Sequence, residues 1–86
     1  MKEYGVLLFE STHHAMEAEK YLKEKNLPAR IISTPEKIKE SCGFSLKYDI
    51  EVEQEILALL NQHDILFEGY FHASGKGLNM TYRKVG

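Results

Sequence analysis

The stretch YGVLLFESTHHAMEAEKYLKEKNLPARIIS, residues 4–33, decides the fold of this chain. Its short apolar run, residues 4–9, is typical of a central β-strand. Ser11 or Thr12 follows as the capping residue of a helix, because a side-chain oxygen at this position satisfies a free amide of the first turn. Residues 29–33 then supply a second strand. The stretch therefore predicts a βαβ unit.

The predicted helix spans about residues 12–25 and carries one apolar stripe. Ala15, Ala18 and Leu22 recur at helical spacing, whereas most of the intervening residues are charged or polar. The Asn-Leu-Pro sequence at 26–28 stops the helix. We expect the apolar stripe to face a sheet.

A third strand follows a connection of about ten residues. Phe44, Leu46 and Tyr48 alternate with polar residues, which predicts that they form the inner face of the strand. The same register leaves Ser45 and Lys47 pointing outward.

A second helix is predicted over about residues 50–62, with Asp49 as its cap. Acidic residues in its first turns, among them Glu53, lie where the positive end of the helix dipole favours them. The apolar face of this helix comprises Val52, Ile56, Leu59 and Leu60. Residues 65–72 are expected to form a fourth strand.

This order of elements predicts an α+β fold of the ferredoxin-like (split βαβ) type, a two-layer sandwich of a mainly antiparallel four-stranded sheet with both helices on one face. A βαβαββ arrangement with a different strand order is the alternative. Residues 1–73 form the domain, and residues 74–86 form a C-terminal extension in which 77–84 can add a strand. So small a core and an unpaired edge strand predict a homodimer.

Length and charge exclude several classes of function. The chain has 86 residues, a net charge of −2 and an isoelectric point near 6.1, so it lacks the basic excess of proteins that bind nucleic acid or anionic membranes. It contains neither an apolar run of membrane-spanning length nor a secretory signal. We expect a cytoplasmic protein.

Cys42 is the one cysteine of the chain. A single thiol cannot close an internal disulfide or run a dithiol cycle, so any covalent chemistry must join its sulfur to an external partner. Ser41 and Gly43 flank it, and a glycine leaves open space beside the preceding side chain. The opposing interpretation is a buried cysteine that only packs, which is the commoner role of a free cysteine.

The connection before Cys42 is expected to support the thiol. Thr34 as a cap and Pro35 as the first helical residue predict a helical turn or two over residues 36–40. Cationic side chains lower the pKa of a thiol, and Lys37, Arg30 and Lys47 are the candidates for this role. Acidic residues in the same turn and the negative end of the helix dipole act in the opposite direction.

Two further groups of residues could carry chemistry. Adjacent helical side chains point about 100° apart, so His13 and His14 cannot easily chelate one ion, and we expect no metal site. Either imidazole could instead act as a base for the thiol, if the first strand ends beside the Cys42 turn. His63 and His72 are expected at the surface. Gly75-Lys76-Gly77 lacks the spacing of a phosphate loop and is expected to be a turn.

Several segments together resemble the selenium/sulfur carrier-like family of small bacterial domains. They are residues 9–12, 15–16, 18–22, 28–35 and 41–46, and Thr34-Pro35, Ile38, Ser41-Cys42-Gly43 and Leu46 are the most specific. The similarity spans about residues 4–72. It implies that Cys42 accepts sulfur or selenium, as a persulfide or selenosulfide, from a donor such as a cysteine desulfurase and passes it to an acceptor protein.

The chain shows no carboxylate pair, Ser-His-Asp constellation or Gly-rich cofactor motif, so a carrier is favoured over a self-sufficient enzyme with a bound cofactor. The alternative is a non-catalytic ferredoxin-like binding or interaction module in which Cys42 is structural.

Overall fold

The computed structural model describes residues 3–40 and 43–86. These residues form five strands, two α-helices and two short 3-10 helices. In chain order they are β1 (Tyr4–Leu8), α1 (Thr12–Glu24), β2 (Ala29–Ser33), β3 (Phe44–Tyr48), η1 (Ile50–Val52), α2 (Glu53–Gln62), β4 (Gly69–Ser74), η2 (Gly77–Asn79) and β5 (Thr81–Lys84).

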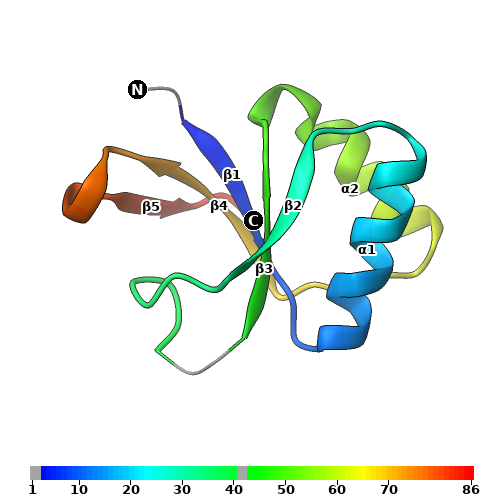
Figure 1. Cartoon of the computed structure of the whole chain (residues 1–86), viewed down its shortest axis with the longest axis horizontal. Coiled ribbons are helices and arrows are strands. Elements are labelled where there is room, and N and C mark those ends of the chain that lie inside the picture. Colours follow the sequence, from blue (N-terminus) through cyan, green and yellow to red (C-terminus); the bar gives the residue numbers. More distant parts are fainter. Residues whose placement is uncertain (1–2, 41–42) are drawn as a thin grey trace.

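The strands form one sheet in the order β2-β3-β1-β4-β5, and every neighbouring pair is antiparallel. Both α-helices cover the same face of this sheet, whereas the connection between β2 and β3 and the turn between β4 and β5 lie away from the helices (Figure 1). The fold is therefore the predicted ferredoxin-like sandwich, and the alternative βαβαββ order is excluded. The extension adds β5 at the edge of the sheet beside β4.

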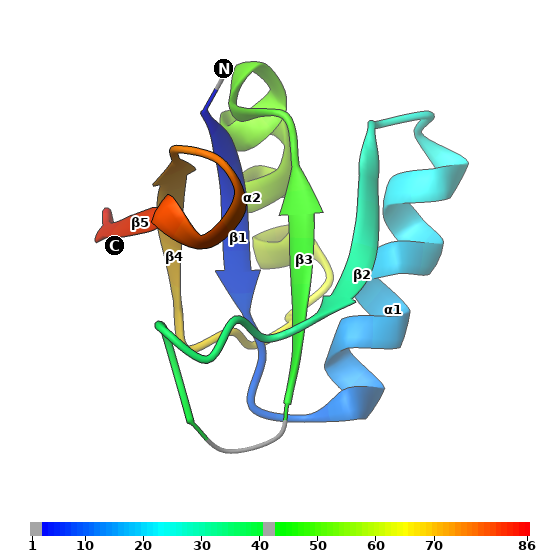
Figure 2. The same cartoon turned by 60° about the vertical axis from the view of Figure 1, so that its left-hand side comes forward.

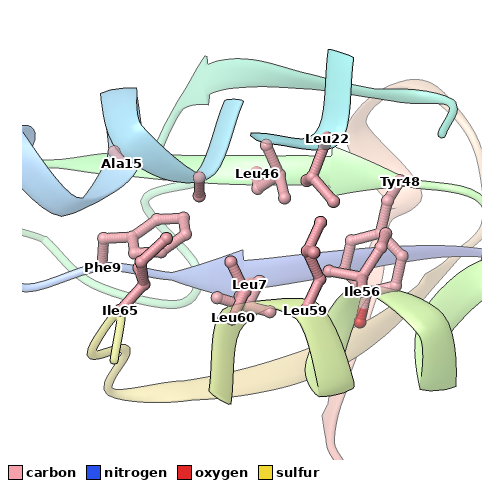
Figure 3. Close-up of a cluster of buried hydrophobic side chains, with 11 residues drawn as sticks. Leu7, Phe9, Ala15, Leu22, Leu46, Tyr48, Ile56, Leu59, Leu60 and Ile65 are labelled. Carbon is pink, nitrogen blue, oxygen red and sulfur yellow. The ribbon is translucent and has the colours of Figure 1, made fainter. Parts of the chain in front are cut away.

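The main core fills the space between the helices and the sheet (Figure 3). Alternate residues of the strands point toward the helices, and those of them in the core, such as Leu7 and Leu46, pack there against the apolar stripes of α1 and α2. The predicted stripe of α1 is confirmed, because Ala15, Ala18 and Leu22 are buried in this core. The remaining buried members of the cluster are Phe9, Tyr48, Ile56, Leu59, Leu60 and Ile65.

A second buried layer lies on the sheet face away from the helices. Successive residues of a strand point to opposite faces, so Val6 and Ala73 belong to this layer, and both are fully buried. Ser45 also points to this face, but it is fully buried and not solvent-exposed as predicted. Phe44 was predicted to point into the core, but it is the first residue of β3 and its exposed fraction is 40%.

Two element boundaries differ from the prediction. The fourth strand begins at Gly69 instead of residue 65, because the chain first closes α2. Asp64 adopts a left-handed φ of 55° and the amide of Ile65 donates back to the carbonyl of Leu60 at 2.9 Å, which is a helix-terminating pattern. The second helix begins as η1, and α2 starts only at Glu53.

The residues that cap the two helices are those that the sequence predicts. The hydroxyl of Ser11 accepts a hydrogen bond from the amide of His14 at 3.1 Å, so Ser11 is the cap of α1. Asp49 accepts from the amide of Glu51 at 3.0 Å, as predicted. Asn26 ends α1 with a φ of 57°. Within the part of the chain that the structure describes, neither α-helix has the length and apolarity that crossing a bilayer requires.

Candidate functional site

The connection between β2 and β3, residues 34–43, contains the candidate carrier residue and is called the 34–43 loop below. Cys42 and Ser41 lie outside the described residues. From the end of β2, residues 34–40 run across the sheet toward β4, and Gly43 leads into β3 (Figure 2).

Both ends of the 34–43 loop are fixed to the sheet by backbone hydrogen bonds. The amide of Thr34 donates to the carbonyl of Gly43 at 3.0 Å, and the amide of Phe9 donates to the carbonyl of Phe44 at 3.3 Å. The hydroxyl oxygens of Thr34 and Ser45 lie 2.8 Å apart and form a further hydrogen bond. Thr34 is thus tied to β3 and does not cap a helix, contrary to the prediction.

Of the helical turn or two predicted over residues 36–40, the structure contains one. Residues 36–38 form a single turn, in which the amides of Ile38 and Lys39 both donate to the carbonyl of Pro35, at 3.0 and 3.1 Å. The turn ends at Ile38 and does not continue into a helix. The negative end of a helix dipole therefore plays no part in the electrostatics of this loop.

The lysines of the 34–43 loop are engaged elsewhere in the chain. The ammonium of Lys37 donates to the carbonyls of Leu78 at 3.1 Å and Met80 at 2.6 Å, both in the C-terminal extension. The ammonium of Lys39 forms an ion pair with Glu68 at 3.3 Å. These contacts attach the loop to the β4 side of the sheet.

Arg30 and Lys47 occupy a different region. They lie opposite each other on β2 and β3, and Lys47 is four residues beyond Gly43. At a rise of about 3.3 Å per residue, this places Lys47 about 13 Å along the strand from Gly43. Both cations lie near Tyr4 and not near Gly43. The ammonium of Lys47 is 4.3 Å from the centre of the Tyr4 ring, and Arg30 lines the same cavity as these two residues.

The two histidines of α1 differ in their surroundings. The first strand does end beside the loop, because Phe9 contacts Phe44 as described above. The Nε2 atom of His13 lies 3.4 Å from Glu17 on an exposed surface. The Nδ1 atom of His14 accepts from the amide of Leu66 at 3.3 Å, so a neutral His14 carries its proton on Nε2. His14 can therefore act as a base only if it gives up this hydrogen bond.

A buried polar network that the sequence did not reveal lies at the start of α2. The hydroxyl of Tyr48 donates to Oε2 of Glu53 at 2.7 Å, and Nε2 of His72 lies 2.7 Å from the same oxygen. Arg83 can only donate, so its contact of 3.3 Å with Nδ1 of His72 leaves the proton of that ring on Nε2, facing Glu53. His72 of β4 is thus not the surface residue that we predicted, because its ring lies against Glu53 at the start of α2.

Gly5 is the sequence signal that could have identified this network. It lies opposite Tyr48 in the sheet, and the Tyr48 ring crosses directly over it. A Cβ atom at position 5 would lie 2.1 Å from Cζ of that ring. A glycine within an otherwise apolar strand indicates such a close approach.

The network predicts a loss of stability in alkali. Burial raises the pKa of Tyr48, and the hydrogen bond to Glu53 and its negative charge raise it further. The unfolded chain releases the Tyr48 proton above about pH 10 while the folded protein keeps it, so the free energy of unfolding falls as pH rises, by up to about 1.4 kcal/mol per pH unit. Urea unfolding between pH 9 and 11 should show a shallower fall for Tyr48→Phe than for the wild type, and equal slopes would contradict the assignment.

Comparison with known proteins points to one family. The family model described as "Putative Se/S carrier protein-like" matches residues 4–72, which include the 34–43 loop and all elements from β1 into β4. The uncharacterized protein MJ0011 of Methanocaldococcus jannaschii is 34% identical over 61 residues. That alignment covers 71% of this chain and 30% of the relative, so the chain spans about a third of the relative's length. No solved structure matches.

The family match covers most of the chain and agrees with the motifs around residues 34–46. Residues 73–86, which include β5 and the carbonyls that bind Lys37, lie beyond it. The chain belongs to the Se/S carrier protein-like family.

Proposed function

We propose that the protein is a sulfur or selenium carrier that holds a persulfide or selenosulfide on Cys42 and passes it to an acceptor protein. The observation that carries this proposal is the family match over residues 4–72, which includes the one cysteine of the chain. The carrier acts in a reducing compartment, since its thiol must be free between cycles, and we therefore place it in the cytoplasm.

The chemistry requires one sulfur on the carrier. The Cys42 thiolate attacks the outer sulfur of a persulfide on the donor, such as a cysteine desulfurase; a new S–S bond forms on Cys42, and the donor leaves as a thiolate. The acceptor then removes the outer sulfur and releases the Cys42 thiolate. No net oxidant is needed, because the sulfane sulfur keeps its oxidation state throughout.

The surroundings of the 34–43 loop support this role. Hydrogen bonds from Thr34 and Phe9 hold Gly43 and Phe44 in place on the side toward β3. A donor protein must approach closely enough to exchange a sulfur atom, and Phe44, two residues from Cys42, offers an exposed apolar contact for it.

The loading reaction tests the proposal. Incubation with a cysteine desulfurase and cysteine, or with inorganic polysulfide, should add the mass of one sulfur to the wild type, and cyanide should then remove it as thiocyanate and restore the thiol. Cys42→Ser should gain no sulfur. The loading rate should rise with pH through the pKa of the thiol, because thiolate is the attacking species.

Two outcomes would contradict the carrier function. One is an adduct of equal size on Cys42→Ser. The other is a Cys42 that resists both polysulfide and alkylation in the folded protein. The second result would favour a binding module with a structural cysteine.

We also propose that the protein is a homodimer. β2 lies at one edge of the sheet, but the carboxylate of Glu19 approaches the amide of Ile31 there, at 3.5 Å, and so hinders strand pairing. β5 lies at the other edge and is the expected pairing strand. Sedimentation at tens of micromolar should give a dimer, and Tyr82→Pro in β5 should shift it toward monomer; a monomeric wild type would refute the dimer.

A further inference from the structure

A cavity of about 390 Å³ opens at the end of the sheet away from Gly43. It lies where β1 and β2 begin and β3 ends, at the top of the sheet in Figure 2. Tyr4, Pro28 and Ala29 give it aromatic and aliphatic walls. Its volume is in the lower part of the range of small-molecule sites, roughly 300–1,000 Å³.

Two cationic side chains, Arg30 and Lys47, line this cavity. Arg30 and Lys47 lie directly opposite each other on β2 and β3, an arrangement that costs stability because like charges repel. Within residues 3–40 and 43–86, the ion pairs that form involve other side chains. The Lys47 ammonium rests 4.3 Å from the centre of the Tyr4 ring. An anion bound between the two cations would relieve their repulsion.

Two acids line the same cavity. Glu3 precedes β1 and Asp49 follows β3. A nucleotide or another polyanion would bring further negative charge toward these carboxylates, which disfavours it. A ligand with one anionic and one cationic group matches the two cations and the two acids together.

We propose that this cavity binds a small amino-acid-like zwitterion. Its carboxylate lies between Arg30 and Lys47, which donate charge-assisted hydrogen bonds to it. Its ammonium group faces Glu3 and Asp49. Its apolar part packs on the Tyr4 ring and Pro28. The site is separate from the 34–43 loop, and the proposal stands whether or not Cys42 carries sulfur.

Amide NMR titration tests the site with three probes. L-phenylalanine carries both charges, N-acetyl-L-phenylalanine lacks the cation, and L-phenylalaninamide lacks the carboxylate. Only phenylalanine should give strong saturable shifts at Tyr4, Arg30 and Lys47, and both blocked compounds should bind at least about tenfold more weakly, because each loses charge-assisted hydrogen bonds.

Substitutions of the two cationic residues test whether phenylalanine binds in this cavity. Arg30→Gln and Lys47→Gln should each weaken phenylalanine at least about tenfold. Lys20→Gln, an exposed lysine on α1 on the other side of the sheet, should bind like the wild type.

Four results would overturn the proposal. They are the absence of saturable shifts, unchanged affinity in both cavity variants, binding of N-acetyl-L-phenylalanine as tight as that of phenylalanine, and shifts at the cavity that follow protein concentration without added ligand. The last result would mean that a second copy of the chain fills the cavity.

Discussion

Replacing Gly5 by alanine is expected to lower the free energy of unfolding by about 3 kcal/mol, the upper end of the cost of overpacking. The new Cβ would lie 2.1 Å from Cζ and 2.6 Å from the hydroxyl oxygen of Tyr48, so the ring must leave its position. The ring then loses its hydrogen bond to Glu53 as well as its burial. Urea unfolding followed by circular dichroism measures the change.

A double-mutant cycle isolates the contact between Gly5 and Tyr48. Leucine at position 48 lacks the ring atoms that a Cβ at position 5 would meet. Gly5→Ala should therefore cost much less in a Tyr48→Leu background than in the wild type. Equal costs in the two backgrounds would show that the ring is not the reason for a glycine in β1.

Replacing Glu53 by alanine is expected to cost about 3 kcal/mol. The change leaves the buried hydroxyl of Tyr48 without its acceptor and removes the partner of His72. Both groups then carry the cost of desolvation without a hydrogen bond. The free energy of unfolding from urea titration is again the measurement.

Glu55→Ala is the matched control for Glu53→Ala. Glu55 lies in the same first turn of α2 and is exposed, so this variant shares the loss of an acid at a helix N-terminus. Its expected cost is within about 0.5 kcal/mol. Similar costs for the two variants would mean that the network around Glu53 contributes no more than the helix dipole does.

Local pattern was sufficient to predict most of the fold. The apolar run of β1, the stripe of α1 and the caps Ser11 and Asp49 are set by neighbours within a few residues, and the structure contains each of them. The start of β4 was misplaced because Ile65 has the apolar character of a strand residue. It serves instead as a core residue directly after α2.

Contacts between distant parts of the chain could not be predicted in this way. Lys37 was considered a neighbour of the thiol, yet its ammonium binds carbonyls more than forty residues away. Glu53 had the position of an ordinary helix-end acid, and only the packing of α2 on the sheet brings it to His72 of β4. Such contacts depend on how the loop, α2 and the C-terminal extension pack against one another and the sheet, for which spacing along the chain gives no signal.

The C-terminal extension links the 34–43 loop to the polar network. Its carbonyls at residues 78 and 80 bind Lys37, and Arg83 contacts His72, which contacts Glu53. The family match ends at residue 72, so the residues of the extension that make these contacts lie beyond the matched region. The extension therefore fixes part of the loop in which Cys42 lies.

The passage of sulfur from Cys42 to another protein tests the central claim most directly. Protein loaded with radiolabelled sulfane sulfur, freed of the donor, is mixed with an extract of the cells that make it, in the presence of a scavenger of free sulfide. The carrier function predicts that label leaves Cys42 and appears on a second protein despite the scavenger. Label that stays on Cys42, or that is released only as free sulfide, would contradict it.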